Sequence, residues 1–201
     1  MGNAISLALA VGVPVLGGGA IGLSIRPDID GWYKKVRKPK WNPPNWVFGP
    51  VWTVLYSAMG VASWRVWQAG GGQLPLTLYG IQLALNFLWS PLFFKKHDLN
   101  LASLDITVLL GVLAATIVEF NKVDPFAAQL LLPYLGWTTF ATALTYWIGL
   151  HNTREGKDVR RAVVDAAEAV EGVASEATAA AATPFLNQSN EVQGDEVPKH
   201  L

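Results

Sequence analysis

Aromatic and amide side chains carry the chemistry that this chain can do. Its 201 residues include nine tryptophans and no cysteine. The absence of cysteine excludes thiol catalysis, thiolate metal sites and disulfides, and no nucleophile–base pair or metal-ligand cluster is visible in the spacing of the other residues. What remains is binding chemistry, because tryptophan faces stack on flat apolar molecules and amides donate and accept hydrogen bonds. The sequence therefore favours a binding protein over a conventional enzyme.

The segment 38–52 concentrates the aromatic residues. It holds three tryptophans and four prolines in fifteen residues, directly before a long apolar run. Proline fixes φ and has no backbone N–H, so this segment cannot be a helix interior or a central strand. We expect a stiff aromatic loop at the mouth of a membrane helix, forming a lid or the wall of a pocket.

Long uncharged runs define the elements that must position these residues. The chain is 51% hydrophobic and 15% charged, against roughly 25% charged in an average soluble protein. Because a membrane helix needs about 20 mostly apolar residues, we predict spans at about 4–25, 47–67, 74–94, 99–119 and 125–150. The predicted fold is an all-α membrane protein, a five-transmembrane-helix bundle of residues 1–152. Residues 153–201 form a tail, weakly helical to about residue 182 and then disordered.

The charges predict how the bundle is oriented and what it does not bind. The segments 26–40, 95–96 and 154–161 carry twelve Lys and Arg, whereas Lys122 stands alone on the opposite side. The positive-inside rule therefore places the Trp/Pro-rich loop between the first two spans, and the C-terminus, in the cytosol. The net charge is zero, which gives no basic excess for nucleic acid. Membrane lipid is the expected surrounding.

Depth brings four unusual residues into one layer. At 1.5 Å per residue, Trp52, Trp89 and Asp105 lie about 8–9 Å below the cytosolic ends of their spans, and Asn86 about 12 Å below. Tryptophans at such depth line or pack a core, whereas those near span ends form interfacial belts. Asn86 either faces a ligand or joins helices by hydrogen bonds. Asp105 is a functional candidate, or an acid that is hydrated near the interface.

Three motifs in order resemble one family of membrane proteins. They are Trp41-Asn42-Pro43-Pro44-x-Trp46 with the following Gly49–Gly60 segment, then Gln82–Phe94, then Leu132–Trp137. Together with five spans they resemble the translocator protein family (TspO/MBR), also called tryptophan-rich sensory proteins or peripheral benzodiazepine receptors. The resemblance covers roughly residues 21–152 and excludes the tail.

The resemblance implies a five-helix bundle, usually a homodimer, with a pocket under the first long loop. It implies ligands rather than a required cofactor: tetrapyrroles such as protoporphyrin IX and haem, sterols and synthetic benzodiazepine-type compounds. Motif matching gives these ligand-binding residues: Tyr33, Trp52, Asn86, Trp89, Trp137 and Ala141. The basic loop residues can meet propionate groups through charge-assisted hydrogen bonds, although the positive-inside signal already accounts for them.

Two departures from the family pattern favour porphyrin over sterol. Thr145 stands where the family often has Asn, which removes an amide near the pocket. The cholesterol motif of the animal members needs a base within five residues after its tyrosine, and Tyr146 is followed by none until Arg154. That motif is weak even when intact.

We therefore predict a membrane receptor or carrier for tetrapyrroles, acting in stress response or porphyrin homeostasis. One alternative is a light- and oxygen-dependent enzyme that degrades porphyrin through Trp52 and Trp137; the other is a sterol transporter. No metal site is predicted, and His97 and His151, at the cytosolic edge, are weak candidates for haem ligation. The family occurs in several membranes; we favour the mitochondrial outer membrane, with a secretory-pathway membrane as the alternative.

Overall fold

The computed structural model describes residues 2–154, 161, 164–165 and 168 of the chain. Residues 1–153 form one compact helical unit, to which the following description refers. The predictions for the tail, helical to about residue 182 and disordered beyond, lie almost entirely outside the described residues.

The described residues of this unit form five α-helices and two π-helical turns. The helices are α1 (Gly2–Asp28), α2 (Asn45–Gln68), α3 (Gln73–Ser90), α4 (Leu99–Val123) and α5 (Pro125–Asn152). The π turns Ile29–Tyr33 and Pro91–Lys95 continue α1 and α3. All five helices agree with the predicted spans to within a few residues at each end, except that α1 and its π turn run through residues 26–33, which were expected in the loop. The fold class, an all-α bundle of five helices, is confirmed.

Proline and aspartate set several of the helix boundaries. α2 begins after Pro44, whose extended backbone (φ −60°, ψ 143°) ends the loop. The side chain of Asp98 accepts a hydrogen bond from the N–H of Leu101 and caps α4. Asp124 likewise caps α5, and Pro125 takes the first helical position, where no N–H is needed. The short turn at Asp124 makes α4 and α5 antiparallel neighbours.

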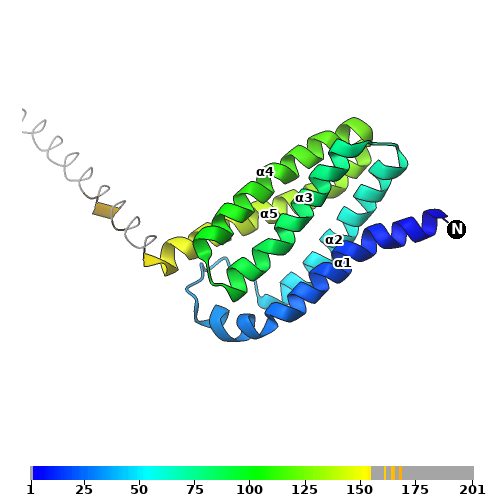
Figure 1. Ribbon diagram of the computed structural model, residues 1–201. Helices are drawn as coiled ribbons and strands as arrows, with labels where there is room; N and C mark the ends of the chain where they lie inside the picture. Colours follow the sequence, from blue (N-terminus) through cyan, green and yellow to red (C-terminus); the bar gives the residue numbers. More distant parts are fainter. Residues whose placement is uncertain (1, 155–160, 162–163, 166–167, 169–201) are drawn as a thin grey trace, which may run out of the picture. The chain divides into compact units, whose positions relative to one another are not determined.

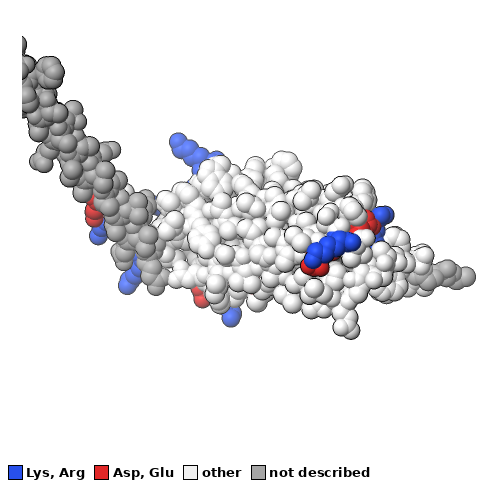
Figure 2. All heavy atoms as spheres, turned by 90° about the horizontal axis from the view of Figure 1, so that it is seen from above, with Lys and Arg blue, Asp and Glu red and all other residues white. Residues whose placement is uncertain are grey.

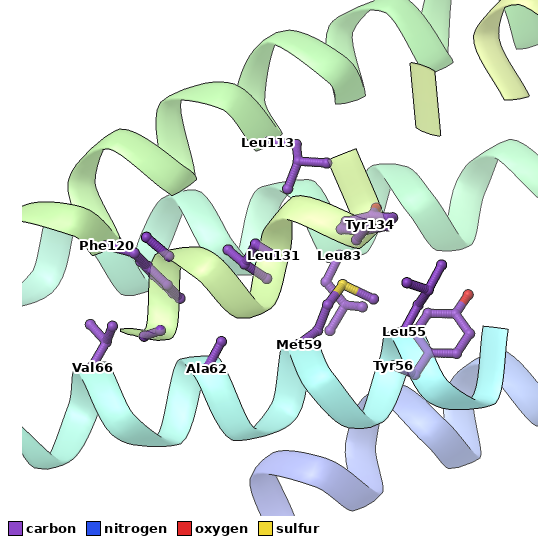
Figure 3. Close-up of a cluster of buried hydrophobic side chains, with 12 residues drawn as sticks. Leu55, Tyr56, Met59, Ala62, Val66, Leu83, Leu113, Phe120, Leu131 and Tyr134 are labelled. Atoms are coloured by element: carbon purple, nitrogen blue, oxygen red, sulfur yellow. The ribbon is translucent and has the colours of Figure 1, made fainter. Parts of the chain in front are cut away.

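The helices pack as a bundle with α1 against α2 and α5 between α2 and α4. α3 packs on α4, and α1 also touches α3 and its π turn. Figure 1 shows α2, α3, α4 and α5 side by side, with α1 lying along α2. A cluster of buried side chains fills the interior, with one stripe from α2 facing residues of α3, α4 and α5 (Figure 3): Leu55, Tyr56, Met59, Ala62, Val66, Leu83, Leu113, Phe120, Leu131 and Tyr134.

Glycine permits the close approach of α1 to α2. A Cβ atom at Gly60 would lie 2.5 Å from the backbone of Ala10 and Val11. A Cβ atom at Gly18 would lie 2.1 Å from the ring of Tyr56. Only residues without a side chain allow these contacts, so Gly18 packs closely against a tyrosine of α2.

The surface and the composition identify an integral membrane protein. Three of the described helices are long and apolar enough to cross a membrane: Asn3–Tyr33, Gln73–Lys95 and Leu99–Val123. α2 and α5, with 24 and 28 residues, are also long enough to span, but their many Trp and Tyr residues carry polar N–H and O–H groups that lower the mean hydropathy. Figure 2 shows charged side chains toward the two ends of the body, with a broad uncharged band between them.

Candidate functional site

A large cavity lies beneath the loop that joins α1 to α2. Its volume is about 730 Å³, within the range of cavities that hold small molecules and cofactors. Its wall comes from α1 and its π turn, the first turns of α2, the end of α3 with its π turn, and α5. Among the described residues that line it, nine are aromatic: Tyr33, Trp46, Phe48, Trp52, Tyr56, Trp89, Phe93, Phe94 and Phe140. A wall of this kind suits a flat apolar ligand.

The α1 wall is hollow because it is made partly of backbone. Gly18, Gly19 and Gly22 line the cavity. A Cβ atom at Gly19 or Gly22 would have no neighbour within 4 Å. These glycines therefore leave the space open, whereas Gly18 admits the ring of Tyr56. Of the Gly18-x-x-x-Gly22 pair, the first glycine thus serves helix packing and the second widens the cavity.

Trp52, which depth and motif matching both singled out, lies in the second turn of α2 and lines the cavity. Its ring stacks on Tyr56, with ring centroids 5.2 Å apart and 27° between the planes. Tyr134 of α5 approaches it edge-on at 6.1 Å. Because both neighbours belong to the core, the Trp52 ring is fixed in orientation before any ligand arrives.

Asn86 lies behind the cavity wall and joins three helices. Its Oδ1 accepts a hydrogen bond from the hydroxyl of Tyr56 at 2.7 Å, and its Nδ2 donates to the hydroxyl of Tyr134 at 2.9 Å. The side chain is absent from the lining of the large cavity. It borders a second void of about 10 Å³, together with Trp52 and Trp89. A void of this size holds at most one water. Of the two roles left open by the sequence, interhelical hydrogen bonding therefore describes the contacts of Asn86.

Trp89 and Ala141 both line the cavity, from α3 and α5. The Trp89 ring stacks on Phe93 at 5.1 Å. Its indole N–H is buried and has no hydrogen-bond partner among the described residues. Trp89 thus offers a ligand one unused donor beside an apolar wall.

Tyr33 lines the cavity and is hydrogen-bonded to the loop between α1 and α2. The residue is 4% exposed, and its hydroxyl donates to Oδ1 of Asn42 at 2.9 Å. The ammonium group of Lys38 lies 4.6 Å from the Tyr33 ring centroid and donates to the carbonyl oxygens of Tyr33 and Val36. Burial of this ammonium group lowers the pKa of Lys38. Lys38 therefore serves the loop itself and does not face a ligand.

A second set of hydrogen bonds connects the loop to the end of α5. The side chain of Asn152 accepts from the N–H of Arg37 at 2.9 Å and donates to the Arg37 carbonyl at 3.0 Å. The sequence pattern did not single out Asn152, because its partners are backbone atoms 115 positions away. Together with the bond between Tyr33 and Asn42, this pair fixes the loop over the cavity.

Trp137 lies outside the described cavity lining, in a layer behind it. Its ring makes edge contacts with Phe48 at 5.7 Å and lies 5.5 Å from Phe140. Both of those residues line the cavity. Trp137 therefore supports the wall instead of forming it.

The two histidines considered for haem are engaged elsewhere. The His97 ring stacks on Trp32 at 4.2 Å. The His151 ring stacks on Trp147 at 3.7 Å, and its Nδ1 lies 2.7 Å from the Trp147 carbonyl oxygen. Neither histidine lines the cavity. The described residues contain no group of three or more His, Cys, Asp or Glu that could hold a metal ion.

Two buried polar groups of the membrane interior lie apart from the cavity. Gln82 is fully buried and its amide nitrogen faces Sδ of Met59 at 3.9 Å. Asp105 is 6% exposed, and its Oδ2 has no hydrogen-bond partner among the described residues. Neither residue lines the cavity. Asp105 is thus a buried acid of α4, and its role stays a prediction.

Comparison with known proteins identifies the class to which this architecture belongs. The TspO/MBR family model matches residues 10–151, and the chain belongs to that family. The chain is 47% identical over 133 residues to the translocator protein of Homo sapiens, covering 63% of this chain and 79% of that protein. It is 42% identical over 125 residues to the tryptophan-rich sensory protein of Cereibacter sphaeroides (62% and 78% covered). It is 37% identical over 149 residues to the tryptophan-rich protein TspO of Chlorobaculum tepidum (72% and 94% covered). Membership supports a role as a membrane receptor or sensor.

Proposed function

We propose that this protein binds tetrapyrroles, with protoporphyrin IX and haem as the leading candidates, in the cavity beneath the α1–α2 loop. The observation that carries the proposal is the stack of Trp52 on Tyr56 at the wall of a cavity of about 730 Å³. A porphyrin is a broad flat π system, and each aromatic pair contributes about 0.5–1.5 kcal/mol beyond the burial of area. A receptor or carrier of such ligands, acting in stress response or porphyrin homeostasis, is the function that this cavity suits best.

In this proposal all five helices cross the membrane and the loop faces the cytosol. The excess of Lys and Arg in the segments 26–40 and 95–96 supports that orientation. At the opposite end, both cations are paired with acids: Arg65 with Asp124 at 2.7 Å, and Lys122 with Glu119 at 2.6 Å. We place the protein in the mitochondrial outer membrane, with a secretory-pathway membrane as the alternative.

The homodimer also belongs to the proposal. Gly80 and Ala84 lie on an exposed face of α3 and are separated by one helical turn. Small residues at this spacing let two membrane helices approach closely. That face is thus free to meet a second copy of the chain.

The cavity gives less support to porphyrin degradation by two tryptophans. Trp52 lines the cavity, but Trp137 lies behind Phe48 and Phe140. A ligand in the cavity would therefore contact one of the two residues implicated in that reaction. If Trp137→Phe abolished light-dependent loss of protoporphyrin while leaving its binding intact, the degradation hypothesis would replace ours.

A binding titration tests the proposal. The purified full chain in detergent is titrated with protoporphyrin IX while tryptophan fluorescence is recorded. We expect saturable quenching, and a loss of affinity of about threefold to tenfold in Trp52→Leu because one stacking partner is removed. The matched control is Trp67→Leu, at the other end of α2, where the side chain is 54% exposed and lies outside the cavity. Absence of quenching, or equal affinities of the two variants, would refute the proposal.

A further inference from the structure

One cationic side chain lines the described part of the cavity. Arg26 of α1 is in the wall, and none of the lysines of the described chain is. Two of the loop cations have partners of their own. Lys34 pairs with Asp30 at 3.1 Å, and Lys38 is bound to backbone carbonyls of its own segment. Neither lysine lines the cavity, so Arg26 is the cation best placed to meet an acidic group of a ligand.

Arg26 lies on the face of α1 that forms the cavity wall. Gly22 one turn before it, and Ile29 and Asp30 one turn after it, also line the cavity. In a helix, residues three and four apart share a face, so the four positions form one continuous strip. The hollow at Gly22 leaves the approach to Arg26 open, since a Cβ atom there would have no neighbour within 4 Å.

The Arg26 guanidinium has no ion-pair or hydrogen-bond partner among the described residues. The one acid of the described lining, Asp30, is already paired with Lys34. A planar guanidinium with five donors binds a carboxylate through two parallel hydrogen bonds. The cavity thus combines a large aromatic wall with a single unpaired cation at its α1 edge.

We propose that Arg26 binds an acidic group at the edge of the ligand, so that the cavity selects flat apolar molecules that carry a carboxylate over their neutral counterparts. The inference rests on the proposed tetrapyrrole function. It adds that the acidic edge of the ligand lies against α1. Because Arg26 is exposed, water weakens the pair, and the contribution to affinity is about twofold to fivefold.

The test compares two porphyrins that differ only in charge. Protoporphyrin IX and its dimethyl ester are titrated against the wild-type full chain, Arg26→Gln and Lys35→Gln. Lys35 is the matched control, because it is an exposed cation of the same segment that does not line the cavity. We expect Arg26→Gln to weaken binding of the diacid about twofold to fivefold and to leave binding of the ester unchanged. Lys35→Gln should change neither affinity, and Arg26→Lys should restore part of the loss.

The other outcomes separate this inference from the function on which it rests. If Arg26→Gln weakens both porphyrins equally, the residue only shapes the wall and the inference is wrong. If it weakens neither, Arg26 is occupied by lipid headgroups or water, and the inference fails while tetrapyrrole binding stands. If Lys35→Gln weakens the diacid as much as Arg26→Gln does, the cause is long-range electrostatic attraction by the basic segment, and the proposed contact at Arg26 is wrong. Failure of the wild type to bind either porphyrin would refute tetrapyrrole binding itself.

Discussion

Replacing Asn86 by Leu removes the polar junction of α2, α3 and α5 while keeping the side-chain volume. Two hydrogen bonds are lost, and the hydroxyls of Tyr56 and Tyr134 are left buried without a partner. Interhelical hydrogen bonds in membrane proteins contribute on average about 0.6 kcal/mol each, with a maximum near 1.7. The free energy of unfolding should therefore fall by roughly 1–3 kcal/mol.

The assay is denaturant-induced unfolding of the purified protein, followed by circular dichroism. A triple variant provides the control, in which Tyr56→Phe and Tyr134→Phe are added to Asn86→Leu. Removing every polar member of a buried network costs less than removing one, so the triple variant should recover part of the lost stability. Wild-type stability of Asn86→Leu, or a triple variant less stable than the single one, would refute the reasoning.

The same substitution should also weaken ligand binding, though indirectly. Tyr56 stacks on Trp52, and Asn86 fixes the Tyr56 hydroxyl. Loss of that bond loosens the wall without removing a ligand contact. We expect a smaller loss of porphyrin affinity in Asn86→Leu than in Trp52→Leu.

Three further predictions concern the ends of the bundle and its α1 seam. Burial alone would raise the pKa of Asp124, but hydrogen bonds from Arg65 and from the N–H groups of Ala127 and Phe126 outweigh it and lower the pKa. The ionised Asp124 carboxylate therefore stabilises the fold above its unfolded pKa of about 3.9. That stabilisation is lost as pH falls through the lower folded pKa. Unfolding midpoints should show that acid-dependent loss in the wild type and a smaller one in Asp124→Asn. Gly60→Ala should lower the free energy of unfolding by about 1–3 kcal/mol, because the new Cβ would lie 2.5 Å from the α1 backbone. Gly111→Ala, where a Cβ has no neighbour within 4 Å, should be neutral or stabilising. Equal stabilities of the two variants would contradict this account of the contact between α1 and α2. Asn152→Ala should speed porphyrin release about threefold or more in stopped-flow measurements, because the two hydrogen bonds between Asn152 and the Arg37 backbone are lost. Gln68→Ala, at the other end of α2, should leave the release rate unchanged. An unchanged rate in Asn152→Ala would show that these hydrogen bonds do not hold the loop closed.

Hydropathy and residue counting located several candidate site residues along the helix axes. Uncharged runs located the five helices, and counting residues from their ends placed Trp52, Asn86 and Trp89 in one layer, where all three border the same small void. Depth does not say which way a side chain faces around the helix axis. That is why depth left the role of Asn86 open. Trp137 was assigned to the site by motif matching alone, and both residues lie outside the cavity lining.

The loop was the part that sequence could not predict. Its lysines were interpreted as a positive-inside signal or as partners of propionate groups, whereas Lys38 folds back onto the carbonyl groups of Tyr33 and Val36. These contacts depend on the chain path between the helices, which proline content constrains only locally. Arg26 was expected in that loop, but α1 continues through Asp28 and its π turn, which carries Arg26 into the cavity wall. No local pattern marked the extension.

The most direct test of the account is an experimental structure of the protein with protoporphyrin IX bound. The account predicts the macrocycle in the cavity between α1, α2 and α5, with its face toward Trp52. A macrocycle bound outside the cavity, such as at the surface beside His97 and Trp32, would contradict it. So would an empty cavity at saturating ligand.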